Sequence, residues 1–252
     1  MNQTDVLAFK LHAKTSAYKM RVRNSLLLIE DAFASASKWY IAFSGGKDST
    51  CILNLVRTVA LDTIAASSIQ QWCLPETTSY LATIANLHLA ASGSDHGTGW
   101  SRNWDSELDI PDGVMWIGGK VGSADKTIKH YGIDGAQGAF VGIRQDESGA
   151  RKIHIRTLGT LFYNHRNEAH QCYPVGHWTL MDVWAYIFEN NLTYNQAYDR
   201  MSEHGIPLEK QRVGPLAIEK ALGYGQLSIV KRCWPELFNR FAAKYPEAHA
   251  YV

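Results

Sequence analysis

An apolar run that passes directly into a glycine turn constrains this chain more than any other feature. Residues 38–43 read KWYIAF, a run rich in aromatic residues that is typical of a buried strand, and Ser44-Gly45-Gly46-Lys47-Asp48-Ser49 follows at once. Apolar residues at helical spacing then occupy residues 51–61. A strand, a glycine turn and a helix in this order form half of a βαβ unit, so they predict a parallel sheet.

The glycine turn has the properties of a phosphate site. Two glycines let the backbone approach an anion without Cβ clashes, and the next helix points free N–H groups and its positive dipole end at that anion. Ser44 and Ser49 add hydroxyl donors, and Lys47 adds charge. The turn lacks the spacing of a Walker A loop and of a dinucleotide GxGxxG loop. The alternative is an ordinary tight turn.

The rest of the chain alternates between strand and helix patterns. The pattern predicts strands within 63–73 and at 114–117 and 139–143, edge strands at 153–157 and 171–175, and helices over 4–33, 78–91 and 178–190. Thr179 followed three residues later by Asp182 resembles a capping box, so we expect Asp182 to cap a helix. The predicted fold class is α/β, a three-layer sandwich with a mainly parallel sheet.

Three segments are expected along the chain. They are an N-terminal helical segment (1–35), a central α/β domain (36–200) with a polar insertion at about 92–113, and a helical C-terminal extension (201–252). The N-terminal segment is basic through Lys10, Lys14, Lys19, Arg21 and Arg23. We interpret this as a solvated helix face. Contact with a nucleic acid or a protein partner is the alternative, and a homo-oligomer is left open.

Composition limits the class of protein. Lys and Arg number 25 against 24 Asp and Glu among 252 residues, and 46% of residues are hydrophobic, which excludes a largely disordered chain. We expect no membrane span, because no run approaches about 18 apolar residues, and no secretory signal. The cysteines are far apart in sequence, which predicts a reducing, cytoplasmic location and no zinc or iron–sulfur site: Cys51, Cys73, Cys172 and Cys233.

The turn and three later segments resemble one family. SGGKDST directly after a strand resembles the PP-loop of the adenine nucleotide α-hydrolase-like superfamily. Leu74–Thr77 is similar to the FPET segment of phosphoadenosine phosphosulfate (PAPS) reductases. Gly142–Ser148 together with Arg151 resembles a GxRxxESxxR segment that PAPS reductase-like proteins share with the small subunit of bacterial ATP sulfurylase. The stretch from Tyr173 to Asp199 resembles the PxxxWTxxDVW…YNxxYD pattern of that branch. The resemblance covers roughly residues 38–240.

The resemblance implies ATP, or a PAPS-like nucleotide, as ligand together with Mg²⁺. The expected reaction is attack by an acceptor on the α-phosphorus, transfer of AMP and release of pyrophosphate. The acceptor stays open among sulfate, a flavin, a nucleobase and a nucleic acid. Lys47, Arg144 and Arg151 are the expected catalytic residues, since guanidinium forks suit phosphate or sulfate oxygens. A structural ion pair is the alternative for the two arginines.

The resemblance also assigns binding roles. The residues expected to hold the nucleotide are Ser44, Gly45, Gly46, Asp48, Ser49, Glu147 and Ser148. Asp48 is the expected metal ligand, and either Asp146 or Glu147 is expected to orient an arginine or hold Mg²⁺. Tyr194, Tyr198 and Asp199 are expected to face the substrate from a loop after the 178–190 helix.

The chain departs from the family at three points. It has no C-terminal ECGxH segment with a cysteine nucleophile, and none of the paired cysteines that relatives carry near residues 212–214. Ile69 replaces a family acid that contacts adenosine or metal. We therefore expect no catalytic cysteine. Two alternative functions stay open. One is a thiol-dependent PAPS or APS reductase, and the other is a non-catalytic nucleotide-binding or interaction protein.

Overall fold

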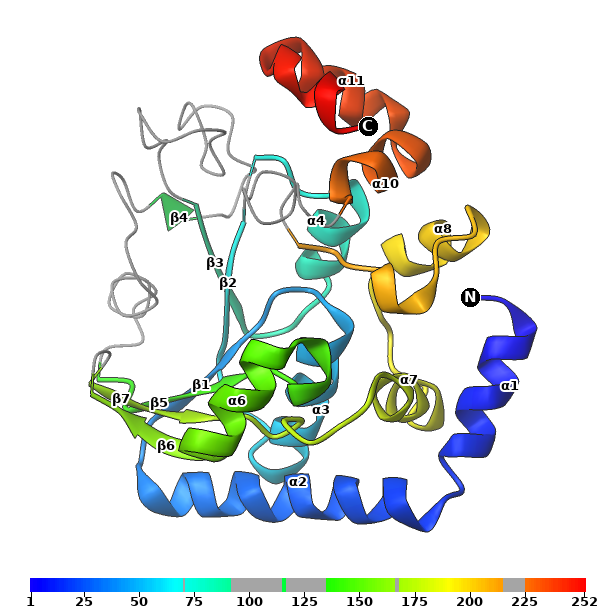
Figure 1. The fold of residues 1–252 in the computed structure, drawn as a ribbon. Helices are drawn as coiled ribbons and strands as arrows, with labels where there is room; N and C mark the ends of the chain where they lie inside the picture. The colour runs from blue at the N-terminus through cyan, green and yellow to red at the C-terminus, as the bar shows by residue number, and fades with distance from the viewer. Residues whose placement is uncertain (70, 92–114, 117–134, 166–167, 215–224) are drawn as a thin grey trace.

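The chain folds around a seven-stranded sheet (Figure 1). A computed structural model describes residues 1–69, 71–91, 115–116, 135–165, 168–214 and 225–252. The strand order is β4-β3-β2-β1-β5-β7-β6, and every pair is parallel except β6 with β7. The strands are β1 (Trp39–Ala42), β2 (Ala65–Ser68), β3 (Leu87–Ala91), β4 (Met115–Trp116), β5 (Gly138–Val141), β6 (Leu161–Asn164) and β7 (Ala169–Cys172).

Helices flank this sheet, so the predicted α/β class with a mainly parallel sheet is confirmed. The α-helices are α1 (Gln3–His12), α2 (Ser16–Ser35), α3 (Lys47–Val59), α4 (Pro75–Ala82), α6 (Gly149–Leu158), α7 (Leu180–Glu189), α8 (Ala197–Glu203), α10 (Gln226–Cys233) and α11 (Pro235–Lys244). Within the described residues, short 3₁₀ helices are η2 (Gln145–Glu147), η3 (Leu208–Lys210) and η4 (Pro246–Tyr251).

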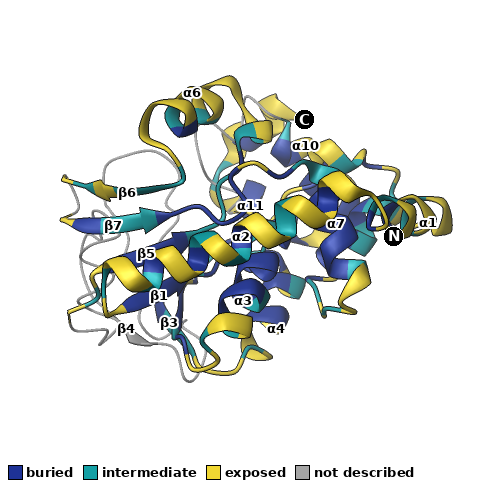
Figure 2. Ribbon diagram, turned by 90° about the horizontal axis from the view of Figure 1, so that it is seen from below, coloured by how far each residue is buried: buried dark blue, intermediate teal, exposed yellow. Residues whose placement is uncertain are grey.

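The two faces of the sheet are built differently. Side chains alternate along each strand, so Trp39 and Ile41 of β1 join the main core with α2, α3 and α7, while Tyr40 points to the other face. Figure 2 shows the buried residues of α3 and α7 gathered under the exposed outer side of α2. The buried residues of the second face are Tyr40, Ala66, Ala90 and Ala139. This second face is lined largely by small side chains.

α1 docks on α7 through aromatic rings. The Phe9 ring lies 5.9 Å from that of Trp184 and 5.6 Å from that of Phe188. Trp184 is fully buried and packs in the core. Burying a side chain of this kind contributes about 1.5–3 kcal/mol, so this contact fixes the first helix to the body of the fold.

Several predicted elements are corrected by the structure. The single helix predicted over 4–33 is two helices, α1 and α2, and Thr15 caps the second. The helix predicted over 78–91 ends at Ala82, and its second half is strand β3. Residues 153–157 lie in helix α6 rather than in an edge strand.

At the far side of the sheet, the strand predicted at 171–175 overlaps β7 only at residues 171–172. β7 is also not at the edge, because β6 pairs with it from outside. The 92–113 insertion lies outside the described residues. The division into three segments stays a prediction. The end of α2 at Ser35 coincides with the first predicted boundary, whereas α8 crosses the second one, after residue 200.

Candidate functional site

A cleft of about 540 Å³ opens at the carboxyl edge of the sheet, where β1 and β5 end. From β1 the chain proceeds to β2 and β3 on one side, whereas β5 lies on the other side of β1. Ligands of open α/β sheets bind at such switch points. The described lining residues are Tyr40, Ala42, Phe43, Ser44, Gly46–Ser49, Ala66–Ser68, Val141–Ile143, Glu147, Arg151, Tyr198 and Arg212–Gly214.

The two glycines of the turn have separate roles. Gly45 has a φ of +71°, a conformation that favours glycine, and a Cβ there would lie 3.3 Å from Cγ2 of Thr77. Gly46 is the N-cap of α3 and offers no side-chain cap. Apart from the N–H of Lys47, which donates to the Tyr198 hydroxyl, the first-turn N–H groups of α3 are therefore left for an anion in the cleft.

Two distant motif residues hold this turn. The buried Asn195 side chain donates to the Gly45 carbonyl oxygen at 3.2 Å and to Oγ1 of Thr77 at 2.8 Å. Thr77 and Asn195 belong to two segments that follow β2 and α7. These contacts fix the strained turn from both sides of the fold.

The two serines of the turn differ in what they can donate. Oγ of Ser49 donates to the Gly46 carbonyl oxygen at 2.9 Å and accepts from the Ser44 backbone N at 3.3 Å. Its only proton is thereby used inside the turn. Oγ of Ser44 lies 3.2 Å from Oγ of Ser49 and lines the cleft, so it can turn its proton toward a ligand.

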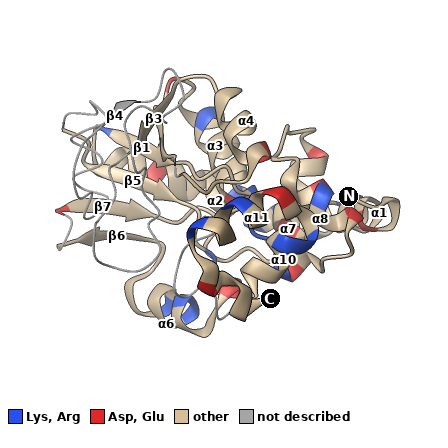
Figure 3. Cartoon of the chain, turned by 90° about the horizontal axis from the view of Figure 1, so that it is seen from above, with Lys and Arg blue, Asp and Glu red and all other residues tan. Residues whose placement is uncertain are grey.

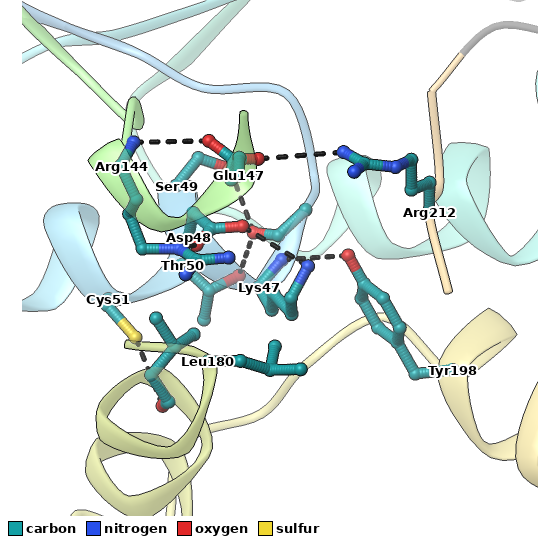
Figure 4. Close-up of polar contacts among 12 residues, drawn as sticks. Lys47, Asp48, Ser49, Thr50, Cys51, Arg144, Glu147, Leu180, Tyr198 and Arg212 are labelled. Carbon is teal, nitrogen blue, oxygen red and sulfur yellow. Dashed lines mark hydrogen bonds and ion pairs between the residues drawn. The ribbon is translucent and has the colours of Figure 1, made fainter. Parts of the chain in front are cut away.

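Tyr198 reaches the start of α3 from α8. Its hydroxyl accepts from the Lys47 backbone N at 3.1 Å, and Nζ of Lys47 lies 5.5 Å from the ring centroid (Figure 4). Burial raises the pKa of Tyr198, so the hydroxyl keeps its proton. The cleft therefore holds a protonated phenol directly beside the helix terminus.

Asp48 sits between two cations. Its Oδ2 lies 3.3 Å from Nζ of Lys47, and its Oδ1 accepts from Nε of Arg144. Burial alone would raise the pKa of Asp48, but the charges of Lys47 and Arg144 outweigh it and hold the pKa below its usual range. Each carboxylate oxygen contacts one of these cations, and the role of Asp48 as magnesium ligand stays a prediction. Among the described residues no cluster of three metal-ligating side chains occurs.

Arg144 and Arg151 occupy different positions. Arg144 is 3% exposed, does not line the cleft, and also bonds Oδ2 of Asp146 at 3.2 Å. Arg151 lines the cleft with 41% of its side chain exposed. The structure thus brings Arg151 to the glycine turn and places Arg144 behind it.

Both acids of the Asp146-Glu147 pair contact arginines, Asp146 through Arg144 and Glu147 through Arg151 and Arg212, so the choice between them stays a prediction. Oε2 of Glu147 accepts from Nη1 of Arg151 and, at 3.1 Å, from the Arg144 backbone N, while Nη1 of Arg212 lies 3.6 Å from Oε1. Ser148 caps α6, since its Oγ accepts from the Arg151 backbone N at 3.2 Å, and its side chain is not part of the cleft wall.

Tyr194 and Asp199 lie away from the cleft. The Tyr194 hydroxyl donates to Asp199 at 2.8 Å, and Asp199 also pairs with the amino group of Met1. Both line a second cavity, of about 760 Å³, whose wall includes Glu76, Arg200 and His204. Of the three predicted substrate-facing residues, only Tyr198 joins the glycine turn, and it stands on helix α8 rather than in a loop.

Sequence reasoning missed Arg212 and the floor of the cleft. Tyr40, Ala42 and Ala66 form that floor from β1 and β2. The alternation of small residues on one face of these strands was the available signal. No periodic pattern in the sequence pointed to Arg212 as a cleft residue, because it lies in an irregular segment far along the chain.

The cysteines and Ile69 are not among the described lining residues, although Ile69 directly follows Ser68 of the lining. Cys51, Cys172 and Cys233 are buried, and burial raises the pKa of each thiol. None of the four cysteines is among the described lining residues. Ile69 is 3% exposed just past β2 and donates its backbone N–H to Ala90 at 2.9 Å, so the position of the family acid belongs to the core.

A glycine turn and a helix N-terminus at the switch point of a parallel sheet place the chain among the open α/β proteins with an anion-binding turn. The chain belongs to the phosphoadenosine phosphosulfate reductase domain family, whose model matches residues 38–204. It is also 34% identical over 58 residues to an adenosine 5'-phosphosulfate reductase of Bacillus cytotoxicus. That match spans 23% of this chain and 23% of the reductase.

Solved structures share the fold. A PAPS reductase from Candida auris aligns with a TM-score of 0.52 at 18% identity, over 85% of this chain and 96% of that chain. The FMN adenylyltransferase of Candida glabrata, solved also in complex with ATP, aligns with a TM-score of 0.51 over 77% of this chain and 65% of that chain, at 11% and 12% identity. None of the described helices is long and apolar enough to cross a membrane.

Proposed function

We propose that the protein binds ATP, or a PAPS-like nucleotide, in the cleft and that, with ATP bound, it transfers AMP to an acceptor. The acceptor attacks the α-phosphorus, the bond from that phosphorus to the bridging oxygen breaks, and its electron pair leaves with pyrophosphate. The protein would contribute positioning and charge rather than a nucleophile of its own. A cytoplasmic location, a nucleic-acid or protein partner and a homo-oligomer stay predictions.

One observation carries the proposal: α3 begins with an uncapped glycine N-cap that opens into the switch-point cleft. Backbone N–H groups, the Ser44 hydroxyl and the protonated hydroxyl of Tyr198 together offer donors to a pyrophosphate group. Gly46 keeps the approach clear of a side chain, and Gly45 makes the turn that exposes it. These residues would bind the β- and γ-phosphates.

Charge in the cleft supports transfer at the α-phosphorus. Lys47 and Arg151 line the same cleft as the turn, so they can offset charge on the phosphate oxygens. Arg144 would act indirectly, by holding Asp48 against Lys47. Mg²⁺ would enter with the polyphosphate, Asp48 stays its predicted ligand, and no step here depends on the ion.

The family relationship also keeps a reductase as the second candidate, since the matched relatives include an APS reductase and a PAPS reductase. Such a reaction needs a thiolate at the sulfur. The buried thiols of Cys51, Cys172 and Cys233 have raised pKa values, and none of the four cysteines is among the described lining residues, which does not favour a thiol of the described residues in this role. The cleft geometry favours AMP transfer.

Incubation with α-labelled ATP and Mg²⁺ tests this function. We expect labelled AMP, free or joined to an added acceptor, and an equal amount of pyrophosphate. A variant with all four cysteines replaced by Ser or Ala should retain this turnover if it folds. Release of inorganic phosphate without pyrophosphate, or loss of turnover traced to one cysteine in a folded variant, would contradict the proposal.

A further inference from the structure

Helix α2 leaves one whole side of itself open to solvent. It is 20 residues long, which corresponds to about 30 Å, and its inner side is buried through Tyr18, Ser25, Ile29 and Ala32. In Figure 1 this helix forms the lower boundary of the described fold, and Figure 2 shows its exposed outer side from below. The outer side of α2 is therefore accessible to another macromolecule.

Apolar side chains stand in a line on this outer side. Met20 is 60% exposed and Leu27 is 48% exposed. Together with Ala34, which is also exposed, they repeat every seven residues. Seven residues are nearly two helical turns, so the three side chains fall on one line along the helix. Such a spacing is the pattern by which two helices pair.

Charged side chains accompany this line, and their sign changes along the helix. The basic residues of α2 all lie in its first half, whereas its acids lie in the second half. Lys19, Arg23 and Glu30 are exposed, share one flank of the apolar line and have no side-chain partner among the described residues. Lys19 and Arg23 are one turn apart and repel each other, and Glu30 lies about 10 Å beyond Arg23, too far for an ion pair.

Helix α6 offers a comparison, because it also exposes an apolar side chain. Ile153 of α6 is 67% exposed. The charged residues of α6 are all basic, namely Arg151, Lys152 and Arg156 (Figure 3). Two copies of α6 would therefore repel each other, whereas α2 carries opposite charges in separate halves and is complementary to itself.

We propose that the outer side of α2 binds a second copy of this chain, whose own α2 lies antiparallel across it. Antiparallel helices related by a two-fold axis bring the same flank of both copies together. With the axis level with Ser25, Glu30 of the second copy comes beside Lys19 and Arg23, and the same pairs form in reverse. Met20 and Leu27 of both copies pack between these pairs. A parallel arrangement would instead place like charges together.

The expected association is weak and reversible. A single pair of helices of this length is at the small end of specific interfaces, so we expect a dissociation constant of about 1–100 µM. Salt screens exposed ion pairs, so the association should weaken as the ionic strength rises. No residue of α2 is among the described lining residues of the cleft, so this inference is independent of the proposed function.

Sedimentation equilibrium of the full chain, from about 1 to 300 µM, tests the contact. We expect the wild-type mass to rise from the 28.2 kDa of one chain toward twice that value. Leu27→Glu, which places a charge in the seam, should weaken self-association about ten-fold or more. Ile153→Glu is the matched control, because it makes the same kind of change on α6, and it should leave the association unchanged. Melting temperatures verify that both variants fold.

Charge reversal tests the antiparallel orientation. Arg23→Glu and Glu30→Arg each place like charges at both symmetry-related contacts, so each variant alone should dimerise about ten-fold more weakly than wild type. An equimolar mixture of the two variants restores opposite charges at both contacts. With one variant fluorescently labelled, we expect a mixed dimer whose affinity lies within about three-fold of the wild-type value.

Three results would overturn the proposal. A wild-type protein that stays monomeric over the whole range excludes the contact. A dimer that neither Leu27→Glu nor Arg23→Glu weakens places the contact on another surface. A mixture of Arg23→Glu and Glu30→Arg that associates no more tightly than either variant alone excludes the orientation. ATP affinity, measured on the same variants, should not change, and a wild-type protein that does not bind ATP would contradict the proposed function without affecting this test.

Discussion

At the residue scale, the glycine turn contains one serine that shapes it and one that can serve a ligand. Ser49→Ala removes bonds to the Gly46 carbonyl and the Ser44 N–H, which should cost about 1–2 kcal/mol and lower the melting temperature by a few degrees. Ser44→Ala should leave the melting temperature nearly unchanged and weaken ATP binding about ten-fold. Thermal melts and calorimetry on both variants verify this, and the reverse pattern would refute it.

Substitutions of the two predicted catalytic arginines, Arg144 and Arg151, should also have different effects. Arg144→Ala leaves Asp48 with half of its buried ion pair, which should cost about 3–5 kcal/mol of folding stability. Arg151→Ala should instead weaken ATP binding or turnover about ten-fold with little change in stability. Equal effects of both substitutions on stability, with normal nucleotide affinity, would show that both arginines are structural.

The sequence could place the glycine turn, Arg151 and Glu147 at one site, because each follows a parallel strand and such ends share an edge. The sequence could not show that Tyr198 faces the cleft and Asp199 does not. On a helix adjacent residues point about 100° apart, so one reaches Lys47 and the other reaches Met1. Only the orientation of α8 decides which side chain meets the cleft.

At the element scale, the errors have local causes. Residues 153–157 read IHIRT, an alternation that imitates a strand, yet Ser148 caps a helix there and Gly159 ends it at φ +81°. After α4, Asn86 adopts a φ of +53° and turns the chain into β3. A single Asn within an apolar stretch does not predict such an end of the helix. Long, strongly periodic elements such as α3 and α7 were predictable, because burial of one face selects them.

The capping box of α7 is a junction for three helices and predicts a pH dependence. Asp182 accepts from Thr179 N at 2.6 Å and Arg21 at 3.1 Å, and lies 2.8 Å from Nε2 of His12. Burial alone would raise the pKa of Asp182, but the bonds from Thr179 and His12 and the charge of Arg21 outweigh it, so the pKa is lowered.

A lowered pKa in the folded state means that the carboxylate stabilises the fold at neutral pH and that this contribution is lost on acidification. Asp182→Asn should therefore cost about 1.5–3 kcal/mol at pH 7. The difference from wild type should shrink once the pH falls below about 3.9, where the unfolded carboxyl titrates. Urea unfolding at pH 7 and pH 3 measures both, and a difference independent of pH would contradict the assignment.

At the scale of the whole molecule, Glu76 joins the C-terminal helices to the α/β body. Both of its oxygens accept from Nε1 of Trp234, at 3.0 and 2.9 Å, and one accepts from Arg200 at 3.1 Å. Arg200 in turn donates to the Cys233 carbonyl and lies over the Trp234 ring. The acid of the FPET-like segment therefore serves the assembly of the fold.

Glu76→Ala should loosen α10 and α11. Hydrogen exchange of residues 226–244 should become at least ten-fold faster, while amides of β1 and β5 keep their protection. Glu236→Ala, which removes an exposed acid from α11, serves as the control and should change neither region. Unchanged exchange over 226–244 in Glu76→Ala would show that the apolar contacts alone hold the extension.

The topology was predictable in outline, since strands that alternate with helices form parallel sheets. The β6–β7 hairpin could not be predicted from the sequence, because its strands carry polar residues such as His170 and Asn164 in place of a clear apolar alternation. The sheet therefore has an outer strand that the pattern of residues did not show.

The central claim is that the glycine turn holds a nucleotide, and ATP affinity in a matched pair of Gly46 variants tests it most directly. A Cβ at Gly46 would lie 3.4 Å from Oγ of Ser44 and 3.5 Å from the Tyr198 hydroxyl and Cγ2 of Val213, so Ala fits in ordinary contact, whereas the branches of Val fill the phosphate space. Calorimetry should show ATP binding retained, though weakened, in Gly46→Ala and abolished in a folded Gly46→Val protein. Wild-type ATP affinity in folded Gly46→Val would contradict the account.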